Sequence, residues 1–132
     1  MTIFKGTIQR FNTGASSNFV ATVNTTNGSA TTIATVPIPL GSTVLIQANI
    51  LGKRTGGSSG SAGDSAGYIL CACYKNVAGT AAEVGESSIF SAEDQAAWTA
   101  TVTANSGNAL IQVTGAADNN VTWKTIVTTY QV

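Results

Sequence analysis

Residues 97 to 132 alternate apolar and polar side chains with a two-residue period, the pattern of a β-strand with one buried face. In residues 98 to 104, a tryptophan, two alanines and a valine alternate with threonines, and further along Trp123 and Val127 share one face. Because a helix repeats every 3.6 residues instead, this segment predicts three antiparallel strands in sequence. They span residues 98 to 104, 110 to 114 and 121 to 131.

Turn-forming residues separate these strands. Ser106-Gly107-Asn108 predicts a tight hairpin, since glycine adopts a positive φ at little cost. Residues 115 to 120, GAADNN, predict a second loop, because Asn and Asp stabilise turns through their own side chains.

Similar patterns run through the rest of the chain. Residues 2 to 10 predict a strand or an extended arm, and residues 19 to 24 and 30 to 36 predict a hairpin around Asn27-Gly28. Further strands are predicted at residues 43 to 52, a long strand, and at residues 67 to 76, a central strand. Residues 81 to 90 predict a strand with a bulge at Gly85. Residues 53 to 65, KRTGGSSGSAGDS, predict a flexible surface loop, and residues 91 to 95 a polar connection.

The sum is eight or nine short strands with no long helical pattern. This predicts an all-β fold, an antiparallel β-sandwich, of which a jelly roll is one form. We expect one domain over residues 1 to 132, in which residues 1 to 18 form an N-terminal arm docked on the domain or an edge strand.

Three large aromatic residues, Tyr68, Trp98 and Trp123, are the expected core anchors. An exposed indole could instead stack on a sugar, so a carbohydrate platform is the alternative interpretation of the tryptophans. Cys71 and Cys73 lie two residues apart and therefore point to the same face, where a disulfide between them would be strained. We expect reduced, buried thiols without a metal or redox role.

Charged residues make up only 9% of the chain, and the net charge is zero. Without a basic field we expect no binding to nucleic acid or to an anionic membrane. No apolar run reaches the roughly 20 residues of a membrane span, and the first residues lack the pattern of a signal peptide.

Histidine is absent from the sequence, which removes the usual general base and the commonest metal ligand. Two acid pairs could in principle cleave a glycoside, Glu93 with Asp94 and Glu83 with Glu86, but we expect solvated surface groups. Asp118, Asn119 and Asn120 could supply oxygen ligands to a Ca²⁺ site, although one carboxylate is few for such an ion and Asx residues that stabilise a turn are the favoured interpretation. We therefore expect no enzyme, no metal and no cofactor.

Four short motifs resemble a β-sandwich domain that recurs in structural proteins of tailed bacteriophages, in tail fibres and in head decoration (cement) proteins. The motifs are Gly67-Tyr68, Ala97-Trp98, Val113-Thr114-Gly115-Ala116-Ala117 and Val121-Thr122-Trp123. The resemblance covers roughly residues 44 to 132 and includes no catalytic signature. It implies a virion protein of the capsid surface or the tail, made in the host cytoplasm.

The first functional hypothesis is a capsid decoration protein that stabilises the head by binding only the assembled shell. The alternative is a receptor-binding or tip module of a tail fibre or spike. In that case the loops at residues 53 to 65 and 115 to 120 would recognise a host glycan or surface protein.

Residues 11 to 52 contain no Asp, Glu, Lys or Arg. Because interface cores are depleted in charge, this suggests a surface covered by another chain; a neutral, exposed surface is the alternative. We expect a homo-oligomer, with a trimer favoured, and the major capsid protein or other virion proteins as partners. The candidate interface residues are Phe4, Ile8, Phe19, Val23, Ile33, Val36, Lys53 and Arg54, with Phe19 and Ile33 as the preferred anchors.

Overall fold

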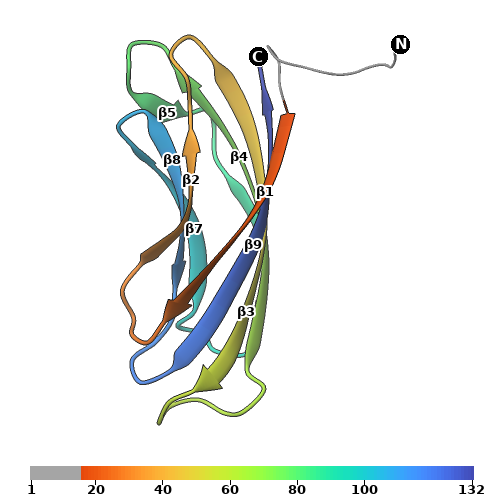
Figure 1. Cartoon of the computed structure of the whole chain (residues 1–132), viewed down its shortest axis with the longest axis vertical. Coiled ribbons are helices and arrows are strands. Elements are labelled where there is room, and N and C mark those ends of the chain that lie inside the picture. The colour runs from red at the N-terminus through yellow and green to blue at the C-terminus, as the bar shows by residue number, and fades with distance from the viewer. Residues whose placement is uncertain (1–15) are drawn as a thin grey trace, which may run out of the picture.

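The computed structural model describes residues 16–132, which form nine β-strands and no helix (Figure 1). The expected strand or arm at residues 2 to 10, and with it Phe4 and Ile8, lies outside the described residues. The strands are β1 (Ser16–Thr25), β2 (Thr31–Pro37), β3 (Thr43–Gly56), β4 (Ser65–Asn76), β5 (Ala81–Glu83), β6 (Ser88–Glu93), β7 (Thr99–Asn105), β8 (Asn108–Thr114) and β9 (Asn120–Gln131).

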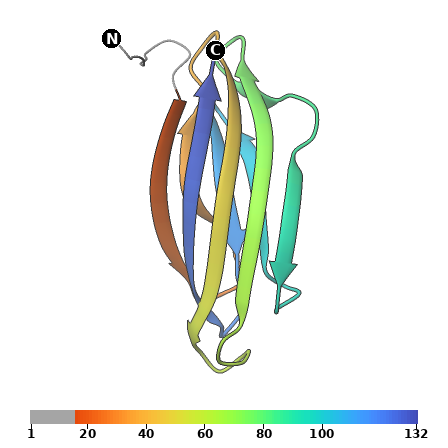
Figure 2. The same ribbon diagram turned by 90° about the vertical axis from the view of Figure 1, so that its right-hand side faces the viewer.

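The strands form two antiparallel sheets that face each other, which confirms the predicted β-sandwich. The larger sheet has six strands in the order β1-β9-β3-β4-β5, with β6 also paired to β4. The smaller sheet has the order β2-β8-β7. Figure 2 looks onto the outer face of the larger sheet, whose inner face packs on the smaller one.

The expected hairpin around Asn27-Gly28 is wrong, because β1 pairs with β9 and β2 pairs with β8. The connecting residues instead carry the chain from one sheet to the other, and Asn27 Oδ1 accepts a hydrogen bond from the backbone N–H of Ser29 at 2.9 Å. The connection between β8 and β9 crosses between the sheets in the same way. A two-residue period identifies the buried face of a strand but not its neighbour, so the sequence pattern did not distinguish a hairpin from a crossing.

The β7–β8 hairpin forms where the sequence predicts it, with Asn105 opposite Asn108. Its positive φ, 55°, falls on Ser106 and not on Gly107. A positive φ at the first of two central residues is the pattern of a type II′ turn.

The strand expected over residues 81 to 90 is two strands, β5 and β6, which are interrupted near Gly85 where φ is 69°. β5 pairs with the end of β4 and β6 with its beginning. β6 also continues to Glu93, so part of the expected polar connection is strand. β3 continues to Gly56, which shortens the expected flexible loop to residues 57–64.

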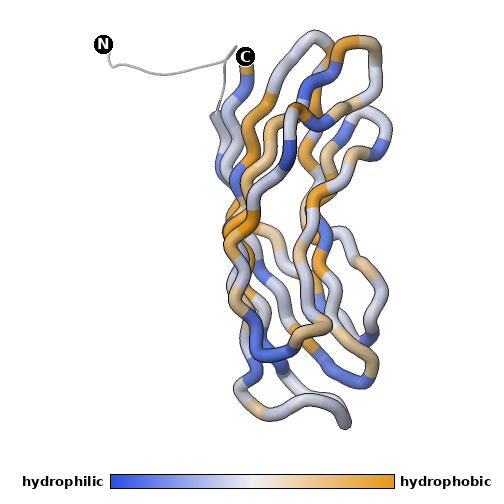
Figure 3. Tube along the Cα trace, turned by 180° about the vertical axis from the view of Figure 1, so that it is seen from behind, coloured by the Kyte–Doolittle hydropathy of each residue, from blue (hydrophilic) through white to orange (hydrophobic). Residues whose placement is uncertain are grey.

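The core is built around three aromatic rings between the sheets. Trp98 and Trp123 are fully buried, and Tyr68 is 2% exposed. Trp98 meets Trp123 edge-on with ring centroids 5.6 Å apart, and Tyr68 stacks on Trp123 at 6.4 Å. Neither indole reaches the surface, so neither is a platform for a sugar. Hydrophobic positions recur along the strands of both sheets in Figure 3.

The two cysteines differ from the sequence expectation in one respect. Cys71 and Cys73 are free and share one face of β4, as the two-residue spacing requires, but they are partly exposed. Their face is the outer one, because the alternate residues Leu70, Ala72 and Tyr74 are buried.

Gly52 in β3 makes room for the indole of Trp123. The two residues are directly paired, and a Cβ at position 52 would lie 2.5 Å from Trp123 Cζ3 and 2.6 Å from Cε3. These distances are far below van der Waals contact, so a side chain at this position would displace the ring. The neighbouring Gly67 in β4 is a contrast, since its added Cβ would meet only Leu51 Cδ2 at 3.8 Å.

Replacing Gly52 with alanine is expected to lower the free energy of unfolding by about 1–3 kcal/mol, the usual effect of overpacking a dense core. Gly67→Ala is the matched control and should leave stability unchanged or raise it by up to about 1 kcal/mol, since alanine loses less backbone entropy on folding. Urea unfolding followed by tryptophan fluorescence measures both. Equal stability of the two variants would show that the indole can move aside.

Candidate binding site at one end of the sandwich

Two loops that the sequence singled out separately lie against each other at one end of the molecule, the lower end in Figure 1. They are residues 57–64 between β3 and β4, and residues 115–119 between β8 and β9; we call this region the loop end. The backbone N–H of Ser59 donates to the carbonyl of Asp118 at 2.9 Å. Thr55 Oγ1 donates to the carbonyl of Asn120 at 3.3 Å. The β3–β4 loop is therefore hydrogen-bonded to the connection between β8 and β9.

Arg54 organises the first loop from within. Its Nε donates to the carbonyl of Ser59 at 2.9 Å and its Nη2 to the carbonyl of Gly57 at 2.6 Å. A guanidinium holds several donors in one plane, so a single arginine can fix two carbonyls of a tight loop. Arg54, expected at an interface, thus stabilises its own loop, whereas Lys53 is exposed.

Asp64 closes the same loop from the other side. Its Oδ2 accepts a hydrogen bond from the backbone N–H of Ser61 at 2.9 Å and one from Gln95 Nε2 at 2.6 Å. These two hydrogen bonds, with a smaller contribution from the charge of Arg54, outweigh partial desolvation and hold the pKa of Asp64 below its usual 3.8. The carboxylate is therefore ionised at neutral pH and connects the loop to residue 95.

The carboxylates of Glu93 and Asp94 accept hydrogen bonds from a core side chain and from the backbone, respectively. Asp94 Oδ2 accepts a hydrogen bond from the N–H of Ser65 at 2.9 Å. Tyr68 donates its hydroxyl to Glu93 Oε1 at 3.1 Å. Burial, this hydrogen bond and the nearby negative charge all raise the pKa of Tyr68 above its usual 10.0, which keeps the phenol protonated as a donor.

The second loop has a buried and an exposed part. Asp118 is exposed with a φ of 58°, a conformation that Asp tolerates better than most residues. Asn119 is 1% exposed and lies beneath the loop end. Within residues 16–132, no group of three or more His, Cys, Asp or Glu side chains could hold a metal ion. Asn119, named from the sequence as a possible Ca²⁺ ligand, is a buried residue. Gln95 was not singled out from the sequence, because no motif distinguishes it from other polar loop residues.

Two of the expected interface residues are core residues instead. Ile33 is 7% exposed and Val36 is 3% exposed, so neither can anchor a contact with another chain, and this part of the prediction is wrong. The pairing of β2 with β8 shifts register between Thr32 and Ala34, and both Ile33 and Ala34 are buried there. Burial explains the apolar residues of β2, whereas its exposed positions are uncharged threonines, Thr32 and Thr35, and Pro37. Phe19 is 36% exposed and Val23 is partly buried on edge strand β1.

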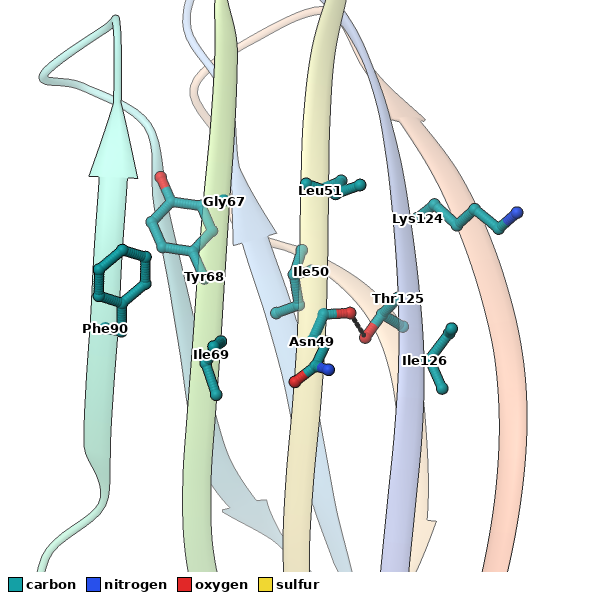
Figure 4. Close-up of a pocket in the computed structure, with 10 residues that line it drawn as sticks. All are labelled: Asn49, Ile50, Leu51, Gly67, Tyr68, Ile69, Phe90, Lys124, Thr125 and Ile126. Atoms are coloured by element: carbon teal, nitrogen blue, oxygen red, sulfur yellow. Dashed lines mark hydrogen bonds between the residues drawn. The ribbon is translucent and has the colours of Figure 1, made fainter.

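A second feature lies away from the loop end, on the outer face of the larger sheet. A shallow groove of about 470 Å³ crosses β9, β3, β4 and β6 (Figure 4). Its lining is mostly apolar, with Leu51, Ile69, Phe90 and Ile126 beside a single cation, Lys124.

Within the described part of the chain, no helix is long and apolar enough to cross a membrane.

No family model matches this sequence, and no curated protein matches it. Among solved structures, the chain is similar to the tailspike protein of Acinetobacter baumannii phage AM24, with a TM-score of 0.49 and 11% sequence identity over 87% of this chain. The match covers 26% of the tailspike chain. A likeness of this degree does not establish a shared role.

The loop end is expected to loosen in acid. Because the pKa of Asp64 is lower in the folded protein than in the unfolded chain, its contribution to stability is present above about pH 3.8 and is lost as the pH falls through the lowered value. An NMR titration should place the Asp64 midpoint below 3.8 and show the Ser61 N–H moving with it. In Asp64→Asn that movement should disappear. An Asp64 midpoint at or above 3.8 would contradict this assignment.

Proposed function

We propose that this chain is a non-enzymatic binding module of a tailed-phage virion, and that its loop end recognises a glycan or protein on the host surface. The observation that carries the proposal is the direct contact of residues 57–64 with residues 115–119 through Ser59 and Asp118. The two loops are far apart in the sequence, yet they lie together at one end of a rigid sandwich. Recognition sites are commonly built from loops that are held in this way.

The internal bonding of the loop end favours recognition by a preorganised surface. Arg54 and Asp64 use their charged groups on the loop itself, so the loop conformation is held before any partner binds. A preorganised loop loses less entropy on binding than a flexible one. Exposed small and polar residues, including Ser58, Ala62 and Ala117, remain available for contact.

The hydrogen bonds that Glu93 and Asp94 accept from within the protein support a binding role without catalysis. Glu93 and Asp94 are the acid pair closest in sequence. Glu93 accepts a hydrogen bond from the Tyr68 hydroxyl, and Asp94 accepts one from the Ser65 N–H. An acid–base pair for glycoside cleavage would instead need both carboxyl groups directed at a substrate. Measured turnover on a glycan that is abolished by Glu93→Gln or Asp94→Asn would overturn this part of the proposal.

The virion assignment rests on the sequence motifs that resemble phage structural proteins. A tail position accords with a recognition surface at one end of the fold. The head-decoration role stays a prediction, and no feature of residues 16–132 favours it over a tail role. Binding of the purified protein to undecorated heads, without binding to host cells, would decide for decoration and against recognition by the loop end.

Arginine substitutions test the recognition surface. Ala62→Arg and Ala117→Arg place a bulky charge on exposed positions of the two loops and should reduce binding to host cells or to an arrayed glycan by about tenfold or more. Ala78→Arg is the matched control, because Ala78 is an exposed alanine in the turn at the opposite end of the sandwich. Binding is expected to be unchanged in Ala78→Arg. Equal loss in all three variants would contradict recognition by the loop end.

A further inference from the structure

The crossing between β1 and β2, residues 26–30, contains the dipeptide Asn27-Gly28, which occurs only once in the sequence. The crossing lies at the loop end, because a Cβ added at Gly115 would be 3.3 Å from the Asn27 carbonyl oxygen. Figure 1 shows it beside the connection between β8 and β9. Asn27 and Gly28 are both exposed, so water reaches the side-chain amide of Asn27.

An asparagine followed by glycine can react with its own backbone. A bond between the glycine nitrogen and the asparagine Cγ closes a five-membered succinimide ring, and both groups belong to the same short segment, which favours the attack. A side chain on the following residue would hinder this approach. Glycine has no Cβ, so it leaves the backbone nitrogen open and allows the backbone rotation that the ring requires.

A hydrogen bond positions the amide of Asn27. Its Oδ1 accepts from the Ser29 N–H at 2.9 Å. Because Ser29 follows Gly28, this hydrogen bond keeps the Asn27 side chain folded over the backbone of residue 28. A donor on the carbonyl oxygen also polarises the carbonyl and stabilises the oxyanion that forms when Cγ is attacked. The Asn27 amide is therefore both held beside the following peptide and activated.

The nitrogen of Gly28 is free to take part. Among residues 16–132, no acceptor receives a hydrogen bond from the Gly28 N–H. Apart from its neighbours in the chain, nothing in this described segment lies within 4 Å of a Cβ added at Gly28. The rotation that brings the nitrogen to Cγ therefore breaks no hydrogen bond of this N–H and meets no packed neighbour.

We propose that Asn27 is a site of spontaneous deamidation in the folded protein. The Gly28 nitrogen forms a bond to Asn27 Cγ, and its proton passes through solvent to the amide nitrogen of the side chain, which leaves as ammonia. One water molecule then opens the succinimide. Hydrolysis at Cγ gives aspartate, and hydrolysis at the backbone carbonyl carbon gives isoaspartate. Only water enters and only ammonia leaves, so the sequence of steps needs no oxidant or reductant.

The product has a carboxylate in a part of the chain that has no charge. The formal net charge is zero, and residues 11 to 52 contain no Asp, Glu, Lys or Arg. Isoaspartate also adds a methylene carbon to the backbone of the crossing. The domain should stay folded, because the crossing lies outside the strands. The reaction thus changes the charge of the loop end, and it does not depend on the proposed recognition role.

Incubation of the native full chain in water labelled with heavy oxygen tests the proposal. Digestion in ordinary water and mass spectrometry follow, so that any reaction during digestion adds only ordinary oxygen. Residue 27 should gain labelled oxygen with time and yield both aspartate and isoaspartate. The rate should rise at mildly alkaline pH, because loss of the N–H proton assists the attack.

Gly28→Ala is the matched variant. The added Cβ meets no neighbour and the φ of Gly28 is not positive, so the fold should be unchanged. The same Cβ hinders the approach of the nitrogen, and labelling of Asn27 should slow by at least about tenfold. Asn105 is the internal control, since it is exposed in the β7–β8 hairpin but is followed by Ser106. It should stay unlabelled while Asn27 reacts.

Tryptophan fluorescence during the incubation must show that the protein is folded. Four results would each overturn the proposal. They are an Asn27 that stays unlabelled in the native protein, equal rates at Asn27 and Asn105, an unchanged rate in folded Gly28→Ala, and aspartate without isoaspartate. Host binding is not part of this measurement, so its loss in the loop variants leaves the result unaffected.

Discussion

The position of the Trp123 indole is the constraint on which the rest of the sandwich depends. Its ring occupies the space above Gly52 on its own sheet, forms an edge-to-face pair with Trp98, and donates from Nε1 to Thr25 Oγ1 at 2.9 Å. An edge-to-face aromatic pair contributes about 0.5–1.5 kcal/mol beyond its buried area. One side chain thus fixes how β9, β3 and the segment before β7 approach one another, and a residue larger than glycine at position 52 would change all three contacts.

The packed core carries two surfaces with different chemistry, the loop end and the outer face of the larger sheet. Alternation along β3, β4 and β9 places one set of side chains in the core, and the remaining set forms the outer face. At the loop end, the polar groups of Arg54, Asp64 and Gln95 are used to hold loops in place. Along the outer face of the sheet, by contrast, several large apolar side chains are exposed.

The sequence predicted the fold class, the buried faces of most strands and the two loops of the candidate site, because these depend on local periodicity and turn chemistry. It did not predict which strands pair. Residues 19 to 24 and 30 to 36 have the pattern of a hairpin, yet they belong to different sheets. Ile33 and Val36 were assigned to an interface because charge is absent around them, whereas both side chains are buried in the core. The row of exposed residues across the larger sheet emerged only from the registers, since Phe90 and Val20 are far apart in sequence and are brought onto one row by three intervening strands.

The pairing of β1 with β9 has a mechanical consequence. Ser16 lies opposite Tyr130, so both strands have these ends on the same side of the molecule, away from the loop end. A force that separates Ser16 from Val132 would break the hydrogen bonds of this antiparallel ladder one after another. We therefore expect little mechanical resistance in this direction. A force between Val132 and the loop end runs along β9 and loads its bonds to β1 and β3 together. The domain should therefore resist tension along its long axis far better than tension between Ser16 and Val132.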